Sequence, residues 1–389
     1  MIKVANWAES LVPSAIQKSV SFSTRPEFTS FALGLPATEL LPSSLLLQGI
    51  DDKLLDYFSL QYSPPIQPLK SHVVSLMEKR GIICDESQIF ITTGAQQAMS
   101  LLTRLLINNN DTVALEELVY PGFLQAIQTL RPNILSIPTD YMAGIDLNAL
   151  ELALNQGERP SLIYIVADGH NPLGLSLSLE KRKKLVELAK SFKVPIIEDD
   201  PYGLLYYDQP LPTLKSLEPE WVMYIGSFSK LIAPSLRVGW IVAPEELMPK
   251  LSIIKEATDL NVSTLSQRII CSFLDKGYLE DHLSLLRSMY KKRRDVMLNS
   301  LDSFFAKKIS YNIPTNGMFV WVELLQKINT YKLLDAAIEE KVTFIPGNSF
   351  AVSSKYTALN CMRLNFSYCN EDKIYHGIKS LSNALNKLV

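Results

Sequence analysis

The chain has 389 residues, of which 47% are hydrophobic, and a formal net charge of −2. A chain of this length exceeds what one hydrophobic core usually serves, so we expect two packed units. It has no Lys/Arg-rich block of the kind that follows nucleic-acid phosphates and no apolar run long enough to cross a membrane, so we expect neither partner and predict a cytoplasmic protein.

The four cysteines include no CxxC pair, and the four histidines form no HxxxH or HExxH motif. We therefore expect reduced thiols rather than a disulfide framework. We also expect no metal site.

Between residues 88 and 244, short apolar runs alternate with helical stretches. The predicted strands are "IFITTG", "DTVALEE", "LIYIVADG", "VPIIEDD", "VMYIGSF" and "VGWIVA". Helical periodicity occurs between them, as in "AQQAMSLLTRLLI" and "LEKRKKLVELAKSF". Continuous apolar strands that alternate with helices predict an α/β domain, in which helices cover both faces of a mostly parallel sheet.

After Pro244 the sequence becomes helical in "LSQRIICSFLDKGYLEDHLSLLRSMYKKRRDVMLNSL". The strands predicted from "GMFVWVEL", "VTFIP" and "MRLNF" then indicate a smaller α+β unit. We expect an N-terminal arm and part of the small domain at 1–44, the large domain at 45–285 and the small domain at 286–389.

Four of the predicted strands end in polar motifs. "TTGAQQ" follows "IFI", "HNPLG" follows "IYIVADG", "EDDPY" follows "VPII", and "SFSK" follows "VMYIG". Because ligands gather beyond the carboxyl ends of parallel strands, we expect these motifs to line one crevice.

Lys230 lies among small and apolar residues in "GSFSKLIAPSLRVGW". A partly desolvated amine can have a lowered pKa and act as a nucleophile toward an aldehyde, whereas the alternative is a surface lysine at a loop tip. Ser227, Ser229 and Arg237 add hydroxyl and guanidinium donors that would suit a bound phosphate.

Two further strand ends suit an anion and a cation. Gly94, Ala95 and Gln96 in "TTGAQQA" would present unpaired backbone N–H groups to an anion, unless the glycine only makes an ordinary turn. Asp199 in "VPIIEDDPY" would be partly buried and need a cationic partner such as a protonated pyridine nitrogen. A cap on the next turn, by Asp199 or Asp200, is the alternative.

Three more residues are candidates from their positions. Asn171 in "HNPLG" could donate to a ring oxygen or simply form an Asn-Pro turn. Tyr120 in "EELVYPGF" could stack on a flat cofactor or belong to the core. Arg363, inside the apolar strand "CMRLNFS", could bind an α-carboxylate or form a structural salt bridge.

Together these residues suit a phosphorylated pyridine aldehyde. Such a cofactor needs an amine for its Schiff base, an acid beside its ring nitrogen and donors at its phosphate. The sparse pairing of Lys230 is then explained by a covalent partner.

The ordered set of motifs resembles the fold-type I pyridoxal-phosphate (PLP) aminotransferases, nearest the branch of 2-aminoadipate and broad-range enzymes. The resemblance runs over nearly the whole chain. Its motifs are "SFALGLPATELLP", "LQYSP", "ITTGAQQA", "HNPLG", "EDDPYGLLYY", "GSFSKLIAPSLRVGW", "NGMFVWVEL", "FIPGNSF" and "MRLNF".

The resemblance implies a role for each matched position. Lys230 would form the Schiff base and act as general acid/base, and Asp199 would pair with the ring nitrogen. Asn171 and Tyr202 would lie at the ring hydroxyl, and Tyr120 would stack on the ring. The implied phosphate contacts are Gly94, Ala95, Gln96, Ser227, Ser229 and Arg237. Arg363 and Gly34 would lie at the substrate carboxylate. Tyr62 would reach the cofactor of a second subunit, which implies a homodimer.

Three departures from the family pattern flank the expected substrate pocket. "PIQPLK" after "QYSP" is shorter than usual and lacks a glycine. Ala167, Gly169 and Leu173 replace a proline, an aromatic residue and a small hydroxyl residue around Asn171, and Leu33 stands where glycine is frequent. The resemblance therefore predicts the cofactor contacts but not the amino donor.

The leading hypothesis is a ping-pong aminotransferase that moves the α-amino group of an L-amino acid to a 2-oxo acid, with 2-oxoglutarate as the acceptor by resemblance. A PLP-dependent lyase or decarboxylase is the alternative, because substrate orientation selects the bond that breaks. An effector-binding domain of a transcription regulator is the third hypothesis. We expect this role least, because the segment before "SFALGLP" is short for the DNA-reading domain of such a regulator and is not notably basic.

Overall fold

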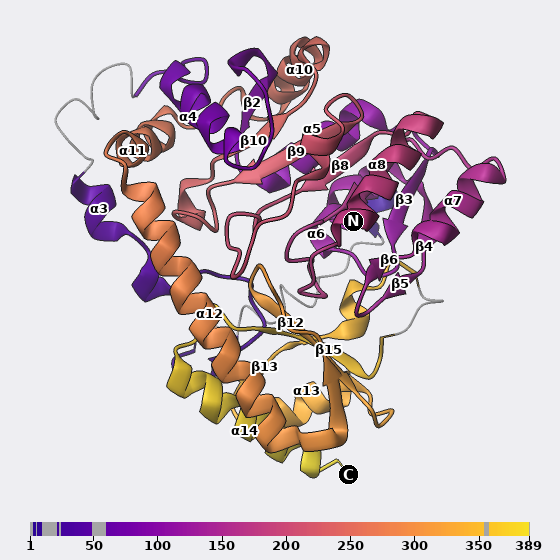
Figure 1. Ribbon diagram of the computed structural model, residues 1–389, viewed down its shortest axis with the longest axis vertical. Helices are drawn as coiled ribbons and strands as arrows, with labels where there is room; N and C mark the ends of the chain where they lie inside the picture. Colours follow the sequence, from indigo (N-terminus) through magenta and orange to yellow (C-terminus); the bar gives the residue numbers. More distant parts are fainter. Residues whose placement is uncertain are drawn as a thin grey trace.

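The computed structural model describes residues 3–4, 6–9, 22, 25–48, 60–353 and 358–388. A broad α/β part occupies the upper half of Figure 1, and a smaller part with its own sheet lies below it. The long helix α12 (Tyr278–Phe305) runs from one part into the other along one side of the molecule. This arrangement confirms the α/β fold class with an additional smaller α+β part.

The large part contains, within the described residues, a seven-stranded sheet of order β2-β10-β9-β8-β7-β3-β4. β10 runs antiparallel to both of its neighbours, and the remaining neighbours are parallel. The strands are β2 (Ile89–Thr92), β3 (Thr112–Glu116), β4 (Asn133–Ile137), β7 (Leu162–Ile165), β8 (Ile196–Asp199), β9 (Val222–Ser227) and β10 (Gly239–Val242). A separate hairpin pairs β5 (Thr139–Asp140) with β6 (Gly144–Ile145).

Helices cover both faces of this sheet. On one face, the apolar side chains of α5 (Ala95–Leu106), α6 (Pro121–Ile127) and α10 (Met248–Asp259) share a core with the sheet. The opposite face packs against α4 (Gln67–Glu78), α7 (Leu147–Asn155), α8 (Leu179–Phe192), α9 (Leu214–Leu217) and α11 (Thr264–Asp275). Burial on both faces explains why the strands are continuously apolar in sequence.

The smaller part has an antiparallel sheet of order β11-β12-β15-β14. Its strands are β11 (Ile309–Tyr311), β12 (Phe319–Leu324), β14 (Ile345–Pro346) and β15 (Cys361–Asn365). Helices α13 (Thr330–Glu339) and α14 (Glu371–Asn386) pack with it and with α12. The N-terminal strand β1 (Thr29–Ser30) pairs in parallel with β13 (Val342–Thr343), which brings the following residues to the junction of the two parts. The short helices α1 (Asn6–Glu9) and α3 (Ser43–Gln48) complete the described N-terminal region.

Side-chain alternation along β8 separates two consecutive acids. Tyr164 of β7 is in register with Ile197 of β8, so both side chains and that of Asp199 belong to the same face. Tyr224 of β9 is in register with Glu198, so it shares the opposite face with Asp200. Asp199 and Asp200 therefore enter different environments.

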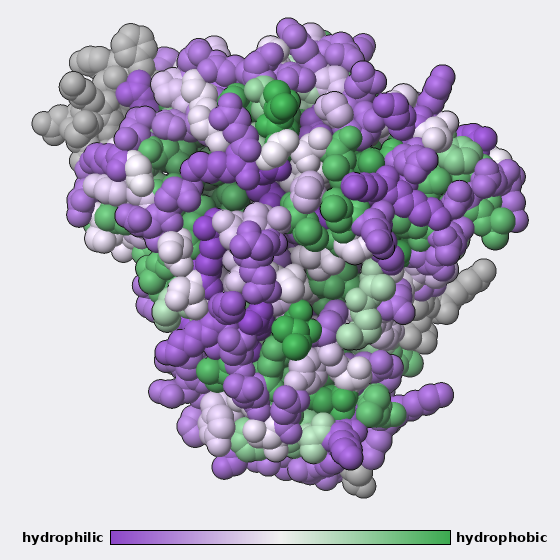
Figure 2. Space-filling model, in the orientation of Figure 1, coloured by the Kyte–Doolittle hydropathy of each residue, from purple (hydrophilic) through white to green (hydrophobic). Residues whose placement is uncertain are grey.

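The predicted strands and helices of the large part are confirmed. "VTFIP" differs, because it is divided between β13 and β14, which pair with β1 and β15 respectively. In the described part of the chain, no helix is long and apolar enough to span a membrane. The face shown in Figure 2 is mainly hydrophilic, with its hydrophobic residues in separate small groups.

Candidate active site

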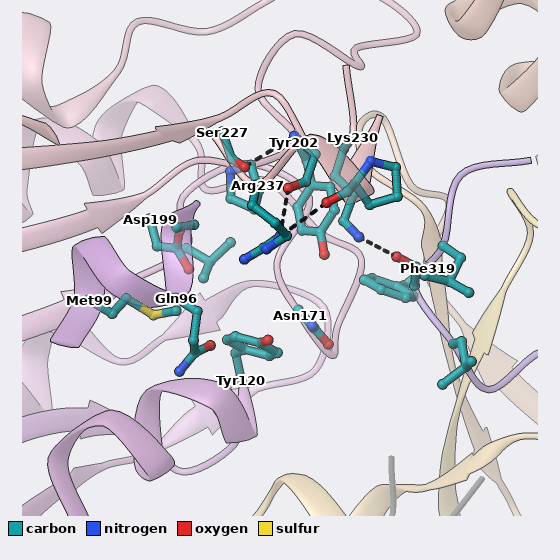
Figure 3. A pocket seen from close by; sticks show the side chains of 18 residues that line it. Gln96, Met99, Tyr120, Asn171, Asp199, Tyr202, Ser227, Lys230, Arg237 and Phe319 are labelled. Carbon is teal, nitrogen blue, oxygen red and sulfur yellow. Dashed lines mark hydrogen bonds between the residues drawn. The ribbon is translucent and has the colours of Figure 1, made fainter. Parts of the chain in front are cut away.

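A cavity of about 350 Å³ lies beyond the carboxyl ends of the parallel strands and is lined by residues of both parts of the molecule. Most of the residues singled out in the sequence line it: Gly34, Ala95, Gln96, Tyr120, Asn171, Asp199, Tyr202, Ser227, Ser229, Lys230 and Arg237. Figure 3 shows Asp199 and Lys230 on two sides of the cavity, with Tyr202 between them and Tyr120 below them in this view. The prediction of a single crevice at four strand ends is confirmed.

Lys230 is partly buried and faces this cavity. Its Nζ donates a hydrogen bond to the backbone oxygen of Gly34 at 2.6 Å. Burial, together with the positive charges of Arg237 and Arg363, lowers the pKa of Lys230 to about 8. The alternative of a solvent-exposed loop lysine is therefore wrong, and a substantial fraction of the amine is neutral near pH 7–8.

Asp199 ends β8 and is buried at the wall of the cavity. Its Oδ2 accepts a hydrogen bond from the hydroxyl of Tyr164 at 2.7 Å, while its Oδ1 is buried without a partner among the described residues. Burial raises the pKa of Asp199 to about 7, with a smaller contribution from Asp200. A buried carboxylate oxygen without a donor fits a cationic or N–H partner from a ligand.

The start of α5 forms an anion-binding cup. Gly94 is the N-cap, with φ of +81°, and a Cβ there would lie 2.6 Å from Nη2 of Arg237, so the guanidinium can approach only because this residue is glycine. Arg237 also donates to Ser229 Oγ and to the backbone oxygen of Thr93, each at 3.3 Å. The first N–H groups of a helix have no helical acceptor, so this cup combines backbone, hydroxyl and guanidinium donors.

Asn171 and Tyr202 line the cavity and contact residues of the smaller part, and Tyr120 lines the cavity with them. Asn171 forms side-chain hydrogen bonds with Arg363, whose Nη1 donates to Oδ1 at 2.7 Å, and with Tyr202. Burial raises the pKa values of Tyr202 and Tyr120, so both phenols stay protonated near neutral pH. Asn171 is therefore more than a turn residue, since it links the ring side of the cavity to β15.

Arg363 lies in β15 and is almost fully buried. The described residues give it no carboxylate partner: it donates to Asn171 and to the backbone oxygen of Ala32, and its Nε has no partner. Its guanidinium carbon lies 4.1 Å from the ring centroid of Phe319. Burial lowers the pKa of Arg363 to about 10. Among the described residues Arg363 forms no structural salt bridge, and a buried cation without an anion fits a carboxylate ligand.

Sequence reasoning missed part of the cavity wall. Phe319 is one such residue, and its ring meets that of Tyr202 edge-on, with 5.8 Å between centroids. Both "GMFVWVEL" and "MRLNF" were predicted as strands, and the structure pairs them with Phe319 opposite Asn365. Because "MRLNF" contains the candidate Arg363, a predicted pairing of these two strands would have brought Phe319 to the site. Further cavity-lining residues that were not assigned to the site are Leu35, Met99, Val166, Pro201 and Pro234.

Two departures from the family pattern have structural consequences. Leu33 lines the cavity, next to the two carbonyl oxygens that hold Arg363 and Lys230. Gly169 has φ of +60°, and a Cβ there would lie 2.9 Å from the Cα of Gly317. The missing aromatic side chain thus allows the turn before Asn171 to touch the backbone that leads into β12.

Gly94 and Arg363 do not line the cavity but contact its lining residues Arg237 and Asn171, whereas Tyr62 lies apart from the rest. It does not line the cavity, and its side chain is 74% exposed. The prediction that it reaches the cofactor of a second subunit concerns another chain and remains a prediction.

The residues present fit pyridoxal phosphate. The cavity offers an amine at Lys230, an unpartnered oxygen at Asp199 for a protonated ring nitrogen, and the cup at Gly94 and Arg237 for a phosphate. The ring of Tyr120 lines the same cavity and could stack on a flat ring.

Comparison with known proteins agrees with this geometry. The family described as "Aminotransferase class I and II" matches residues 56–381. An aromatic-amino-acid aminotransferase from Thermococcus litoralis is 34% identical over 96% of this chain and 92% of its own length. A 2-aminoadipate transaminase from Thermus thermophilus is 33% identical over 100% of this chain and 99% of its own.

A solved structure is also closely similar. The kynurenine aminotransferase of Pyrococcus horikoshii, in complex with PMP, KYN as substrates and KYA as products, superposes with a TM-score of 0.92. It is 34% identical, and the match covers 99% of this chain and 97% of that one.

Proposed function

This chain belongs to the class I and II aminotransferase family and is a PLP-dependent transaminase, and from that premise we propose that it transfers the α-amino group of an L-amino acid to 2-oxoglutarate by a ping-pong mechanism. The observation that carries the residue assignment is the cavity in which Lys230 and the unpartnered Oδ1 of Asp199 lie among donors for a phosphate and a carboxylate. The relatives act on aromatic amino acids, 2-aminoadipate and kynurenine, and these define the donors to test first.

The cofactor would be held at four points by this chain. Lys230 would bind its aldehyde carbon, Asp199 its ring nitrogen, Asn171 and Tyr202 its ring oxygen, and the cup at the start of α5 with Ser227, Ser229 and Arg237 its phosphate. When bound, PLP supplies an electron-withdrawing ring that makes the α-hydrogen of an attached amino acid acidic.

Lys230 would move the proton between the substrate carbon and the cofactor carbon. Among the described residues, its Nζ is held by the oxygen of Gly34 alone, so the amine is free to turn once that hydrogen bond is released. A pKa of about 8 keeps it close to working pH in both the neutral and the protonated form, which is the condition for an efficient general base and acid.

Arg363 would bind the substrate α-carboxylate with N–H donors of its guanidinium that Asn171 and Ala32 do not use. Its bonds to Asn171 and Ala32 fix the orientation of this group, and the ring of Phe319 excludes water from one side. A carboxylate in this position would place the substrate α-carbon toward Lys230, near Leu33 and Gly34, which line the same wall.

We propose that the enzyme works as a homodimer. Two apolar residues near Tyr62 are exposed, Leu60 at 72% and Leu260 at 54%. The chain around Tyr62 is joined to the chain around Leu260 by a 2.6 Å hydrogen bond from Nδ2 of Asn261 to the backbone oxygen of Ser63. An exposed apolar group of this kind supports association with a second copy.

We also propose a cytoplasmic location and a division of the chain into an N-terminal arm at 1–44, a large domain at 45–285 and a small domain at 286–389.

Borohydride reduction of the PLP-loaded protein, followed by peptide mapping, tests the role of Lys230. We expect one labelled peptide that contains Lys230, and a label on another lysine would overturn the assignment.

Mass analysis of products then tests the reaction. A 2-oxo acid that keeps its carboxylate, together with glutamate formed from 2-oxoglutarate, supports the proposal. CO₂, or ammonia with pyruvate, would instead support a decarboxylase or a lyase.

A further inference from the structure

The buried carboxylate of Asp199 is held by one side chain that the sequence did not single out. The hydroxyl of Tyr164 donates to Oδ2 at 2.7 Å, and both residues are at most 3% exposed. Oδ1 is also buried but has no partner among the described residues. The two oxygens therefore differ: one is occupied by the protein, and the other is left for a ligand.

Tyr164 can fix the orientation of this carboxylate because its own ring is fixed. It lies in β7, on the same sheet face as Asp199, and stacks on Phe123 of α6 with 3.8 Å between centroids and 15° between ring planes. Burial raises the pKa of Tyr164 well above its usual value, with a further contribution from Asp199, so the hydroxyl keeps its proton. It can therefore act as a permanent donor to Oδ2.

We propose that Tyr164 is the positioning residue that presents Oδ1 of Asp199 to the ring nitrogen of the cofactor and favours the ionised form of this carboxylate. The inference rests on the proposed role of Asp199 and deepens it, because it names the group that sets the charge of the ring-nitrogen partner. Without the hydroxyl, burial would favour the neutral acid, which holds a ring-nitrogen proton much less strongly.

Other titratable groups around Asp199 cannot take over this function. Tyr120 and Tyr202 interact with it electrostatically, but among the described residues Tyr164 is the only side chain that donates a hydrogen bond to it. Asp200 adds a negative charge that raises the pKa of Asp199 further. Loss of the Tyr164 hydroxyl is thus expected to raise the pKa of Asp199 without compensation.

The structure provides a matched control on the opposite face of the sheet. Tyr224 of β9 is 2% exposed, and its hydroxyl donates to Oδ2 of Asp200 at 2.8 Å. Tyr164→Phe and Tyr224→Phe each remove one buried hydroxyl that donates to one of two consecutive carboxylates. Only the first of these carboxylates lines the cavity.

The experiment compares both variants with the wild type after loading with PLP. The readouts are the dissociation constant for PLP, the pH midpoint of the visible absorbance, and kcat and KM measured separately. For Tyr164→Phe we expect about 10-fold weaker PLP binding and about 10-fold lower kcat with little change in KM, as for loss of one charge-assisted hydrogen bond. The absorbance midpoint should move to higher pH, because a less positive ring withdraws less electron density from the Lys230 nitrogen.

Tyr224→Phe should change the unfolding midpoint but leave the absorbance midpoint and PLP affinity unchanged. Equal absorbance midpoints in all three proteins would overturn the positioning role of Tyr164, as would equal shifts in the two variants. A wild type that gains no visible absorbance with PLP would instead contradict the proposed role of Lys230. The two failures can therefore be distinguished.

Discussion

Two groups of buried charges lie beside each other at the ends of β7 and β8, and they are built in opposite ways. In the first, which we call the paired cluster, Arg80 donates to Asp168 at 2.8 Å and to Asp200 at 2.9 Å, and Arg182 contacts Asp168 at 2.5 Å. In the second, the active site, the charged groups of Lys230, Asp199 and Arg363 have no oppositely charged partner among the described residues.

The two groups respond to burial differently. Burial alone would raise the pKa of Asp168, but Arg182 and Arg80 together hold it below its usual value. Asp199, equally buried but without a cation, has its pKa raised to about 7. Charges that are satisfied within the chain stabilise the fold, whereas charges that are left unsatisfied are available to a ligand. Consecutive residues, Asp199 and Asp200, belong to the two different groups.

Removal of the active-site amine should separate function from stability most strongly. We expect Lys230→Ala to lower turnover by more than about 10⁴-fold, because one group serves as nucleophile and as proton carrier. The free energy of unfolding of the cofactor-free protein should change by no more than about 1 kcal/mol, since only one hydrogen bond is lost and a desolvated amine is removed. Chemical denaturation and single-turnover kinetics would test both parts. Normal turnover would contradict the assignment.

Disruption of the paired cluster should have the opposite effect. Arg80→Met would leave Asp168 and Asp200 buried without this cation, and we expect a loss of about 3–5 kcal/mol in the free energy of unfolding. The adjacent Lys79→Met is the matched control. Lys79 pairs with Glu280 at 2.5 Å, but both side chains are more than half exposed, so its loss should cost less than about 1 kcal/mol. Equal losses in urea denaturation would show that the cluster is not what stabilises this region.

The sequence was sufficient to predict the strand ends and most of the cavity. Apolar runs followed by "TTGAQQ", "HNPLG", "EDDPY" and "SFSK" specify both the sheet and the residues at its carboxyl edge. Alternation along β8 decides between Asp199 and Asp200, although which face carries the site depends on packing against α5 and α6. The order of the motifs predicted their roles.

Contacts that depend on register or on backbone atoms could not be predicted in this way. The backbone oxygens of Ala32 and Gly34 accept hydrogen bonds from Arg363 and Lys230, respectively. Every residue has a backbone carbonyl group, so the residue type does not show which of them makes such a contact. The hydrogen bond from Tyr164 to Asp199 depends on the offset between β7 and β8, which the sequence does not fix. A buried tyrosine in an apolar strand therefore looks like an ordinary core residue.

Exchange of the two consecutive acids for amides should affect activity at one position and stability at the other. Asp199→Asn should lower kcat on the order of 10²–10³-fold by removing the charge beside the ring nitrogen, with little loss of stability. Asp200→Asn should cost about 2–3 kcal/mol of stability, because Asp200 accepts hydrogen bonds from Arg80 and Tyr224, with kcat within about 10-fold of the wild type. Thermal or urea unfolding and steady-state kinetics on both variants would test this, and the reverse pattern would contradict it.

The pH dependence of unfolding gives the smallest effect, and the two groups should show opposite signs. The pKa of Asp199 is raised from 3.8 to about 7, so the folded protein binds a proton that the unfolded chain has released between these values. Its contribution is therefore favourable at low pH and is lost as pH rises through this window, with a slope of at most about 1.4 kcal/mol per pH unit.

The pKa of Asp168 is lowered, so its contribution is present above pH 3.8 and is lost as pH falls through its folded-state pKa. Cofactor-free wild type and Asp199→Asn, unfolded in urea at a series of pH values, should diverge between pH 4 and 7, while both should lose stability in the same way below pH 4. Glu198, whose burial raises its pKa to about 7, is common to both proteins, so its effect cancels in the difference. A difference that does not change with pH would mean that Asp199 is already paired within the chain, and the distinction between the two groups of charges would then fail.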